Sequence, residues 1–458
     1  MQIGPSLFEG VSKDVSIVQM SVLGKRWYAA RGSVAVKSIL GNSSIRIRIP
    51  VGPEASSRLR LGEFGLFLNS NLGPWRMCRK LFAEGIGNDK FLKGVNAKLN
   101  EYMAVNIKLM EKAAGTATPV LVNELGRRIT LDIIMDVTFS EKRGSATSFL
   151  EDVNEGREIQ PDSLFVMARG IMDANSFYNK VPPLVFKHVL TSADKMHTDS
   201  VDQFVSAIEE RVSQKQKELG EVPEIHQGDF DFATSLFAAS KSLPEESRMN
   251  FVVCMVRETI AGGTDSTSNA IAYLIYELAR NQDIADAICA QIVEVAGPSG
   301  AIDSECLKKL TLLEASVFEI TRLYAIAPNV RRYITEDVII DNVLLKKDSD
   351  IIITLGMNMH DPLVWETPET FDPTRFLNKL SKPEGPYGFG WNYSPFGYGV
   401  RKCPGEDLAV LELKLVIAYL CRRFRFILAN PNEPLEITDS LFRECGPLPI
   451  IFEQRVEQ

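Results

Sequence analysis

Histidine is scarce in this chain, with four copies among 458 residues. The four are far apart and form neither an HxxxH nor an HExxH spacing: His188, His197, His226 and His360. Histidine-based metal catalysis therefore has little support. The seven cysteines are an odd number and include no CxxC pair. This usage argues against a disulfide scaffold or a structural zinc site, and it fits a reducing compartment.

Long hydrophobic runs and excess positive charge are also missing. Residues 1–25 contain neither a membrane span nor the regions of a signal peptide, so we expect the chain as it stands to be soluble. The 51 Lys and Arg residues face 59 Asp and Glu, a net charge of −8 that disfavours a nucleic-acid partner. Linkers, repeats and low-complexity segments are absent. We therefore expect one domain over residues 1–458, although the length exceeds that of most single cores.

The hydrophobic pattern predicts a mainly α fold with small β-sheets, of the α+β class. Residues 16–30 resemble a β-hairpin, and most of 74–281 has helical periodicity. The longest predicted helix, 248–280, is apolar nearly all round, which is typical of a helix that runs through the centre of a protein. Further helices are predicted at 304–324 and 404–423. The β-rich portions are 16–50, 332–355 and 425–453.

The strongest chemical signal is the segment FGYGVRKCPG at residues 396–405. Cys403 lies just before a predicted helix, where the positive end of the helix dipole and unpaired backbone N–H groups stabilise a thiolate. The nearby glycines allow a tight loop whose backbone can approach a flat ligand, and Arg401 can bind an anionic group. For an isolated cysteine the more common interpretation is a small buried hydrophobe in a glycine loop.

This segment resembles the haem-binding signature FxxGxRxCxG of the cytochrome P450 superfamily at all five fixed positions. These are Phe396, Gly399, Arg401, Cys403 and Gly405. The resemblance implies a haem b cofactor with Cys403 as axial ligand and metal-binding residue, and a cytochrome P450 fold with its long central helix over the haem. Three further motifs of the family follow in the right order, so that the resemblance covers most of the chain.

Two motifs imply structural or cofactor-binding residues. Glu319 and Arg322 match ExxR, and Arg375 lies in FDPTRF, which is similar to the family's FxPxRF. By resemblance, these three form a buried network behind the haem, although such i, i+3 spacing alone usually means a surface ion pair. Trp75 and Arg79 match WxxxR, whose members contact a haem propionate in the family; as an isolated motif they would be ordinary packing.

Arg332 resembles a further propionate partner, and the adjacent Arg331 is the alternative register. In family members with such contacts, the planar and permanently charged guanidinium suits a carboxylate.

The remaining motif lies in the middle of the long apolar helix. Gly262 and Gly263 precede Asp265, Ser266 and Thr267, and an aspartate is costly in a buried helix unless it has a task. A polar notch for helix packing is the simple alternative. The segment resembles the family's oxygen-activation motif [AG]Gx[DE]T, which implies that Asp265 is the acid of a proton relay. Ser266 takes the place of the usual threonine and lacks the methyl group that restricts χ1, while Thr267 offers a second hydroxyl.

The resemblance also implies partners. WxxxR begins at residue 75, earlier than in membrane-bound members, so the chain looks like a eukaryotic microsomal type without its N-terminal anchor. With its anchor it would belong on the cytosolic face of the endoplasmic reticulum; as the chain stands, we expect it in the cytoplasm. About fifty-five residues follow Cys403, so we expect no fused reductase domain. Electrons would come from NADPH, indirectly, through NADPH-cytochrome P450 reductase, with cytochrome b5 as a second candidate. A docking patch is predicted from six basic residues: Arg76, Lys80, Arg401, Lys402, Lys414 and Arg422.

The expected activity is insertion of one oxygen atom of O2 into a lipophilic, terpenoid, steroid or fatty-acid-like substrate. The segments that face it by resemblance are 61–74, 160–185, 256–264, 325–330 and the turn at Gly446, and most of their residues are apolar. A haem-thiolate isomerase or dehydratase is an alternative, against which the Asp265–Ser266 pair argues. A non-catalytic haem protein and a truncated, poorly folding pseudoenzyme are the others.

Overall fold

The structure is a computed structural model, and it describes residues 6–22, 24–45, 53–67, 69–86, 89–180, 191–224, 231–377, 389–439 and 441–455. The chain forms two compact units. Unit 1 consists of residues 1–50, 311–406 and 437–444, and unit 2 consists of residues 51–310, 407–436 and 445–458. The single-domain expectation stays a prediction.

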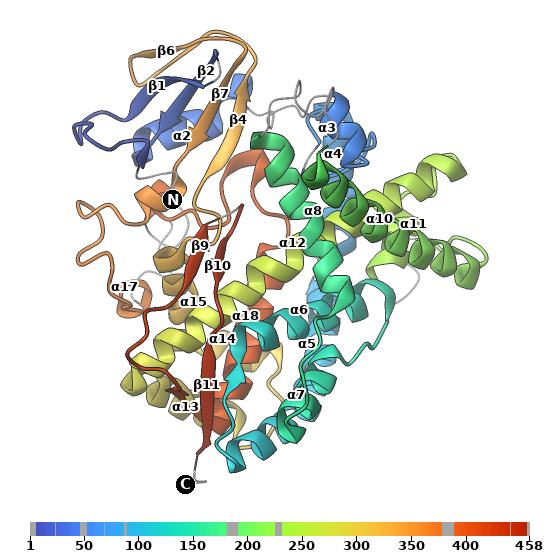
Figure 1. The fold of residues 1–458 in the computed structure, drawn as a ribbon, viewed down its shortest axis with the longest axis vertical. Helices are drawn as coiled ribbons and strands as arrows, with labels where there is room; N and C mark the ends of the chain where they lie inside the picture. Colours follow the sequence, from blue (N-terminus) through green and yellow to red (C-terminus); the bar gives the residue numbers. More distant parts are fainter. Residues whose placement is uncertain are drawn as a thin grey trace. The chain divides into compact units, whose positions relative to one another are not determined.

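Unit 1 is built on a four-stranded sheet with the strand order β1-β2-β7-β4. The predicted hairpin is confirmed: β1 (Ile17–Val22) and β2 (Lys25–Ala30) are antiparallel. β2 pairs in parallel with β7 (Ser349–Ile353), which is buried along its whole length and pairs on its other side with β4 (Val330–Ile334). Figure 1 shows these blue and orange strands side by side, so the sheet joins the two ends of a long stretch of sequence.

The other elements of unit 1 include those that carry the expected network and the cysteine loop. They are the hairpin β5 (Val338–Ile340) and β6 (Val343–Leu345), the strand β9 (Ile437–Asp439), the helices α2 (Ser33–Gly41), α15 (Thr311–Tyr324), α16 (Leu355–Asn358) and α17 (Thr374–Leu377), and the 3₁₀ turns η1 (Ser43–Ile45), η3 (Gly390–Asn392) and η4 (Gly399–Arg401). β9 pairs with β10 (Arg443–Cys445), whose last residue belongs to unit 2.

Unit 2 is helical and is organised around α12 (Glu245–Arg280), which confirms the long central helix. Figure 1 shows α6 (Val122–Phe139) beside it, and the two helices pack closely. The other helices are α3 (Pro53–Arg58), α4 (Leu72–Ile86), α5 (Asp89–Gly115), α7 (Ser145–Glu155), α8 (Ser163–Lys180), α10 (Ser192–Leu219), α11 (Phe232–Ala239), α13 (Gln282–Ala296), α14 (Ser304–Lys309) and α18 (Glu406–Arg423), whose first residue lies in unit 1. A small sheet has the order β3 (Val120–Leu121), β11 (Pro449–Gln454) and β8 (Phe424–Leu428).

The helix predicted at 304–324 is wrong as one helix, because the chain forms α14 and α15 with a break at Leu310. Leu310 leaves helical geometry at ψ 67° and its side chain is fully buried. Asp303 caps α14 by accepting a hydrogen bond from the backbone N–H of Cys306. Apolar spacing continues across the break, since both helices bury a face, and periodicity therefore cannot distinguish one helix from two.

The predicted fold class, mainly α with small sheets, is confirmed by this architecture. Among the residues that the structure describes, no helix combines the length and the apolar character needed to cross a membrane. Within the same residues, His, Cys, Asp and Glu side chains do not gather into a group that could hold a metal ion.

Candidate active site

The cysteine loop of unit 1 has a conformation that depends on two glycines. Gly397 and Gly399 have φ angles of 71° and 68°, in the left-handed region that side chains other than glycine rarely adopt. A Cβ atom on Gly399 would lie 2.9 Å from the carbonyl oxygen of Leu40, in α2. The N–H of Cys403 donates to the carbonyl of Phe396 over 2.8 Å and closes the loop. Two of the five signature positions are thus tied directly together.

The thiol that this loop presents differs from the other six. Cys403 is exposed, whereas Cys78, Cys254, Cys421 and Cys445 are buried and Cys289 and Cys306 are intermediate. A Cβ atom added to Gly405 would meet no other atom within 4 Å, so the backbone beside the thiol is bare. α18 begins three residues after Cys403, and Glu406 in its first turn forms an ion pair with Lys402.

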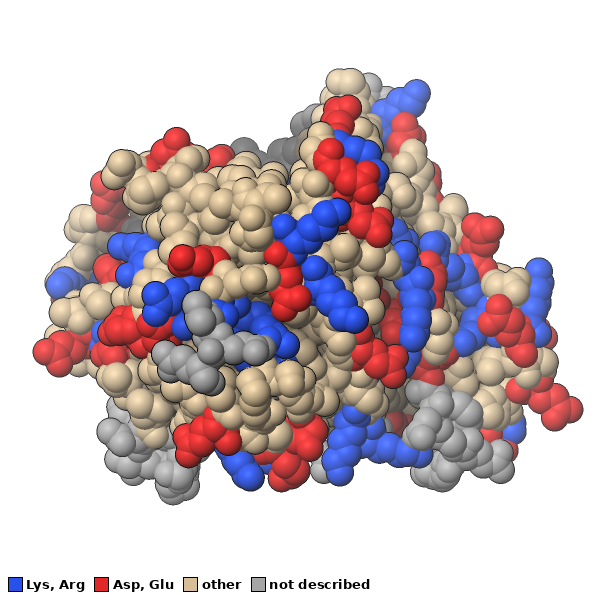
Figure 2. All heavy atoms as spheres, turned by 90° about the horizontal axis from the view of Figure 1, so that it is seen from below, with Lys and Arg blue, Asp and Glu red and all other residues tan. Residues whose placement is uncertain are grey.

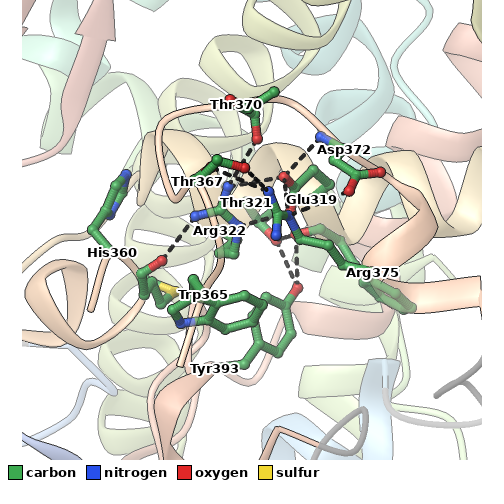
Figure 3. Close-up of polar contacts among 12 residues, drawn as sticks. Glu319, Thr321, Arg322, His360, Trp365, Thr367, Thr370, Asp372, Arg375 and Tyr393 are labelled. Atoms are coloured by element: carbon green, nitrogen blue, oxygen red, sulfur yellow. Dashed lines mark hydrogen bonds and ion pairs between the residues drawn. The ribbon is translucent and has the colours of Figure 1, made fainter. Parts of the chain in front are cut away.

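Glu319 and Arg322 form a closed ion pair on α15 (Figure 3). Nε and Nη2 of Arg322 donate to the two carboxylate oxygens of Glu319 over 2.7 and 2.8 Å, and both side chains are fully buried. Arg322 also donates from Nη1 to the carbonyl of Met359 and from Nη2 to that of Thr370. Such a pair is stable in the interior only because each remaining polar atom finds a partner.

The same carboxylate holds the segment that contains Arg375. Oε1 of Glu319 accepts the backbone N–H of Asp372 at 3.0 Å and Nε of Arg375 at 3.4 Å. Arg375 further donates to the carbonyl of Thr367 at 3.1 Å. Figure 3 shows the three charged side chains converging, Glu319 and Arg322 from α15 and Arg375 from α17. The network therefore fixes the backbone from about residue 359 to 375.

Two aromatic residues of this network were not found from the sequence. The guanidinium of Arg322 lies over the Trp365 ring, 5.1 Å from its centroid, and the indole N–H of Trp365 donates to the carbonyl of Asn358. The hydroxyl of Tyr393 is 2.8 Å from that of Thr321 and donates to the carbonyl of Phe318. A buried indole or phenol needs a polar partner, but the sequence does not say which one.

Arg331 and Arg332 point to opposite faces of β4, as neighbours on a strand do. Arg332 is 3% exposed and donates to the carbonyl of Arg331, whereas the guanidinium of Arg331 stacks on the ring of Trp27 at 4.4 Å. Burial lowers the pKa of Arg331, and the nearby charge of Asp350 acts in the opposite direction. The two arginines considered as propionate partners, Arg331 and Arg332, thus have guanidinium groups in quite different surroundings.

The other predicted residues lie in unit 2. Trp75 is buried and Arg79 half-buried, one turn apart on α4. The C-terminal part of α4 is fixed against α11, because the ring of Phe82 packs edge-on against that of Phe232 and Gly85 leaves room for the same ring. The helix that carries the two WxxxR residues is therefore anchored by an interaction that does not involve them.

The centre of α12 carries the predicted relay residues. Asp265 is 6% exposed, Thr267 is buried and Ser266 is half-buried. The hydroxyl of Ser266 donates to the carbonyl of Gly262 over 2.9 Å, which leaves its oxygen to accept from other groups. Asn269 ties this part of the helix to the tail: its amide donates to the carbonyl of Asp265, and its Oδ1 accepts the backbone N–H of Cys445.

The two adjacent glycines of α12 lie on different faces of the helix, Gly263 against α6 and Gly262 toward open space. A Cβ on Gly263 would touch the side chain of Ile134 in α6 at 3.6 Å, whereas a Cβ on Gly262 would meet nothing within 4 Å. On α6, a Cβ on Gly126 would lie 3.2 Å from the carbonyl oxygen of Ser268, so the two helices approach closely there. Gly262 belongs to the same face as Asp265, three residues on.

The predicted basic docking patch is wrong as a set of six. Arg401, Lys414 and Arg422 are buried, and Arg422 donates to the carbonyls of Gly297 and Gly300, where burial lowers its pKa. Its guanidinium supports the turn after α13. Arg76 and Lys80 are exposed on α4, and Lys402 is half-buried and paired. On the face shown in Figure 2, cationic and anionic side chains lie interspersed.

A comparison with protein-family models identifies the family of this chain. The model of the family described as cytochrome P450 matches residues 11–448. The chain belongs to the cytochrome P450 family.

Named relatives of this cytochrome P450 match it at low identity. The sterol 26-hydroxylase, mitochondrial, of Rattus norvegicus is 27% identical over 80% of this chain and 68% of its own length. The aromatase of Homo sapiens is 25% identical over 79% and 66%, and the cholesterol side-chain cleavage enzyme, mitochondrial, of Homo sapiens is 26% identical over 73% and 61%. The chain therefore spans between 61% and 68% of the length of these three relatives.

The residues of this cytochrome P450 fit a haem with a thiolate ligand. The donor is available, because Cys403 is the exposed thiol in a loop that only glycines at 397 and 399 permit. The bare backbone at Gly405 admits a flat group beside the sulfur. Arg332 and Arg401 would supply buried positive charge in unit 1. These ligand roles are proposals.

Proposed function

We propose that this cytochrome P450 is a haem-thiolate monooxygenase that inserts one oxygen atom of O2 into a lipophilic substrate. The observation that carries the proposal is the conformation of residues 396–405, which leaves the Cys403 thiol exposed and is closed by the hydrogen bond from the N–H of Cys403 to the carbonyl of Phe396. When bound, a thiolate-ligated haem b supplies the oxygen chemistry. The protein supplies the ligand, the proton donors and a dry surface.

In this proposal the residues divide the work by position. Cys403 binds the iron, and Phe396, Gly399 and Gly405 shape the loop around it. Trp75, Arg79, Arg332 and Arg401 bind the propionates.

Asp265 is the buried acid that delivers protons, and Ser266 is the hydroxyl that relays them. The Ser266 hydroxyl donates to the carbonyl of Gly262 in the structure, so it relays a proton only when its O–H turns from that carbonyl toward the next acceptor. Thr267 is the second hydroxyl. Glu319, Arg322 and Arg375 hold the supporting loop.

The substrate we propose is a steroid- or terpenoid-sized lipid. The relatives named above are called a sterol hydroxylase, an aromatase and a cholesterol side-chain cleavage enzyme, which supports a substrate of this class. Fatty acids are the next class to test.

The electron donor we propose is NADPH-cytochrome P450 reductase, with cytochrome b5 as an auxiliary, on the cytosolic face of the endoplasmic reticulum. Exposed Arg76 and Lys80 suit an acidic docking surface. Two of the relatives are named as mitochondrial, so the decisive comparison is between the diflavin reductase and a small iron–sulfur donor. Faster reduction by the iron–sulfur donor would reject both the proposed reductase partner and the proposed location at the endoplasmic reticulum.

The ligand is tested with Cys403→Ala, and Cys306→Ser serves as the matched control. Wild-type protein and the control should show the thiolate-type difference spectrum when reduced under carbon monoxide. Cys403→Ala should lose that spectrum while its far-ultraviolet circular dichroism stays unchanged. A thiolate-type spectrum that survives in Cys403→Ala would reject the assignment, and so would its absence from the wild type reconstituted with haem.

A further inference from the structure

Residues 60–67, which we call the strap, run across α12 within unit 2 and are held at several points. Arg60 adopts a positive φ of 48°, and its carbonyl accepts a hydrogen bond from Nη1 of Arg257 over 2.9 Å. The ring of Phe64 packs edge-on against that of Phe251, with centroids 5.5 Å apart. The backbone N–H of Gly65 donates to the thiol sulfur of Cys78 on α4. α12 and α4 therefore both hold the strap.

Glu258 makes the most specific of these contacts. One carboxylate oxygen, Oε2, accepts the backbone N–H groups of Leu66 and of Phe67, the latter over 2.7 Å. Gly65 has a φ of 134°, and a Cβ there would lie 2.7 Å from Oε1 of Glu258. Glycine is thus required for the carboxylate to approach. Hydrogen bonds from neutral donors to a charged acceptor are among the stronger ones in proteins.

The position of Glu258 along α12 connects this contact with the proposed chemistry. Phe251, Glu258, Gly262 and Asp265 follow one another at spacings of seven, four and three residues, which places all four on one face of the helix. The face thus carries the strap contact at one end, bare backbone at Gly262 and the buried acid Asp265 at the other. A carboxylate inside an apolar helix is costly unless it has a partner, and here the partner is the strap.

We propose that Glu258 is a positioning residue that latches the strap over the N-terminal end of the substrate face of α12, and so limits which lipids reach Gly262 and Asp265. The proposal rests on the proposed function in one respect, that this face receives the substrate. The latch uses main-chain donors of the strap, so the strap side chains can vary while its path stays fixed. Glu258 acts through Leu66 and Phe67 and takes no part in proton delivery.

The latch itself is tested by hydrogen–deuterium exchange on the intact, haem-loaded chain. Glu258→Ala should speed exchange in peptides covering 60–67 by about tenfold or more, because two charge-assisted hydrogen bonds are lost. Gly65→Ala should do the same with Glu258 still present, since the added methyl displaces the carboxylate. Glu258→Gln retains an acceptor oxygen and should restore most of the protection. Glu246→Gln, at an exposed site on the same helix, is the matched control. Unchanged exchange in both disrupting variants would overturn the proposal.

Selectivity is tested with 1-butylimidazole and 1-dodecylimidazole as iron-binding probes. Glu258→Ala and Gly65→Ala should accelerate association of the dodecyl probe by about tenfold, reflecting the same opening, and leave the butyl probe within twofold. Equal acceleration of both probes, or of neither, would reject control of access. Failure of the proposed function can be distinguished from failure of the latch. A wild type without the thiolate spectrum would rule out the imidazole experiment, whereas hydrogen–deuterium exchange would still show whether Glu258 holds the strap.

Discussion

Arg322 donates from Nε and Nη2 to both carboxylate oxygens of Glu319, three residues earlier on the same helix, and neither side chain has any exposed surface. The chain contains a pair with the same spacing in the opposite surroundings. Glu305 and Lys308 are also three residues apart and 2.8 Å from each other, yet both are about 70% exposed. Because the two pairs share the same spacing, a comparison of them shows how much burial alone changes the contribution of an ion pair to stability.

We predict that Glu319→Ala destabilises the protein by about 3–5 kcal/mol, because it leaves the Arg322 charge buried without its partner. Glu305→Ala removes an exposed ion pair that water already screens, so it should leave the free energy of unfolding nearly unchanged. Urea unfolding followed by circular dichroism measures both. Equal effects in the two variants would mean that the network contributes no more than a surface ion pair.

The proton relay predicts a change in what becomes of dioxygen. Asp265→Asn should slow product formation by about 10²–10⁴, the usual contribution of a positioned proton donor, and leave the haem spectrum intact. NADPH consumption should continue with hydrogen peroxide released in place of product. Ser266→Ala should be milder, because Thr267 is adjacent, and Ser266→Thr should keep or improve coupling. The measurement is the ratio of product to NADPH with peroxide quantified in parallel. Wild-type coupling in Asp265→Asn would assign Asp265 to packing.

Glu412 on α18 predicts a pH dependence of stability. Burial without a compensating charge raises the pKa of its carboxyl from 4.5 to about 8. The folded state therefore holds a proton that the unfolded state has lost over this interval, so stability falls as pH rises from about 4.5 to about 8. Glu412→Gln should remove this loss and raise the free energy of unfolding at pH 8 by roughly 2–5 kcal/mol relative to wild type.

The control for that experiment is Glu453→Gln, at an exposed site on β11, which should keep the wild-type slope. The free energy of unfolding is compared at pH 5 and pH 8 for all three proteins. A wild-type slope in Glu412→Gln would show that the carboxyl is ionised in the folded protein at both values.

Much of this molecule follows from sequence patterns that act locally. Apolar residues on every side of 248–280 predict a buried helix, and α12 is one. The composition of 16–30 predicts the hairpin of β1 and β2, and the short strands expected within 332–355 include β7. The spacing of Glu319 and Arg322 places them on one face of a helix, and that is where they form an ion pair. Such features depend on neighbours within a few residues, which the sequence displays directly.

The remainder depends on contacts between distant backbone groups. Glu258 is visible as a charge on an apolar helix, but its partners are N–H groups some 190 residues away that carry no sequence signal. Arg422 resembles a surface charge at the end of a helix until the carbonyls of Gly297 and Gly300 are known. The end of α14 at Leu310 cannot be seen in the sequence, because apolar residues continue at helical spacing into α15. For Glu258 and Arg422 the deciding partner is main chain, whose chemistry is the same at every residue.

The parallel pairing of β2 with β7 also has a consequence for synthesis on the ribosome. The hairpin of β1 and β2 emerges first, but the strand that covers its inner edge follows roughly 320 residues later, which at about 5–20 residues per second is a delay of roughly 15 to 65 s. During that time the inner edge of β2 presents unsatisfied main-chain groups to any other extended chain. Translation therefore exposes the nascent protein to strand exchange with its neighbours until residues 349–353 arrive, and holding chaperones would act on this hairpin.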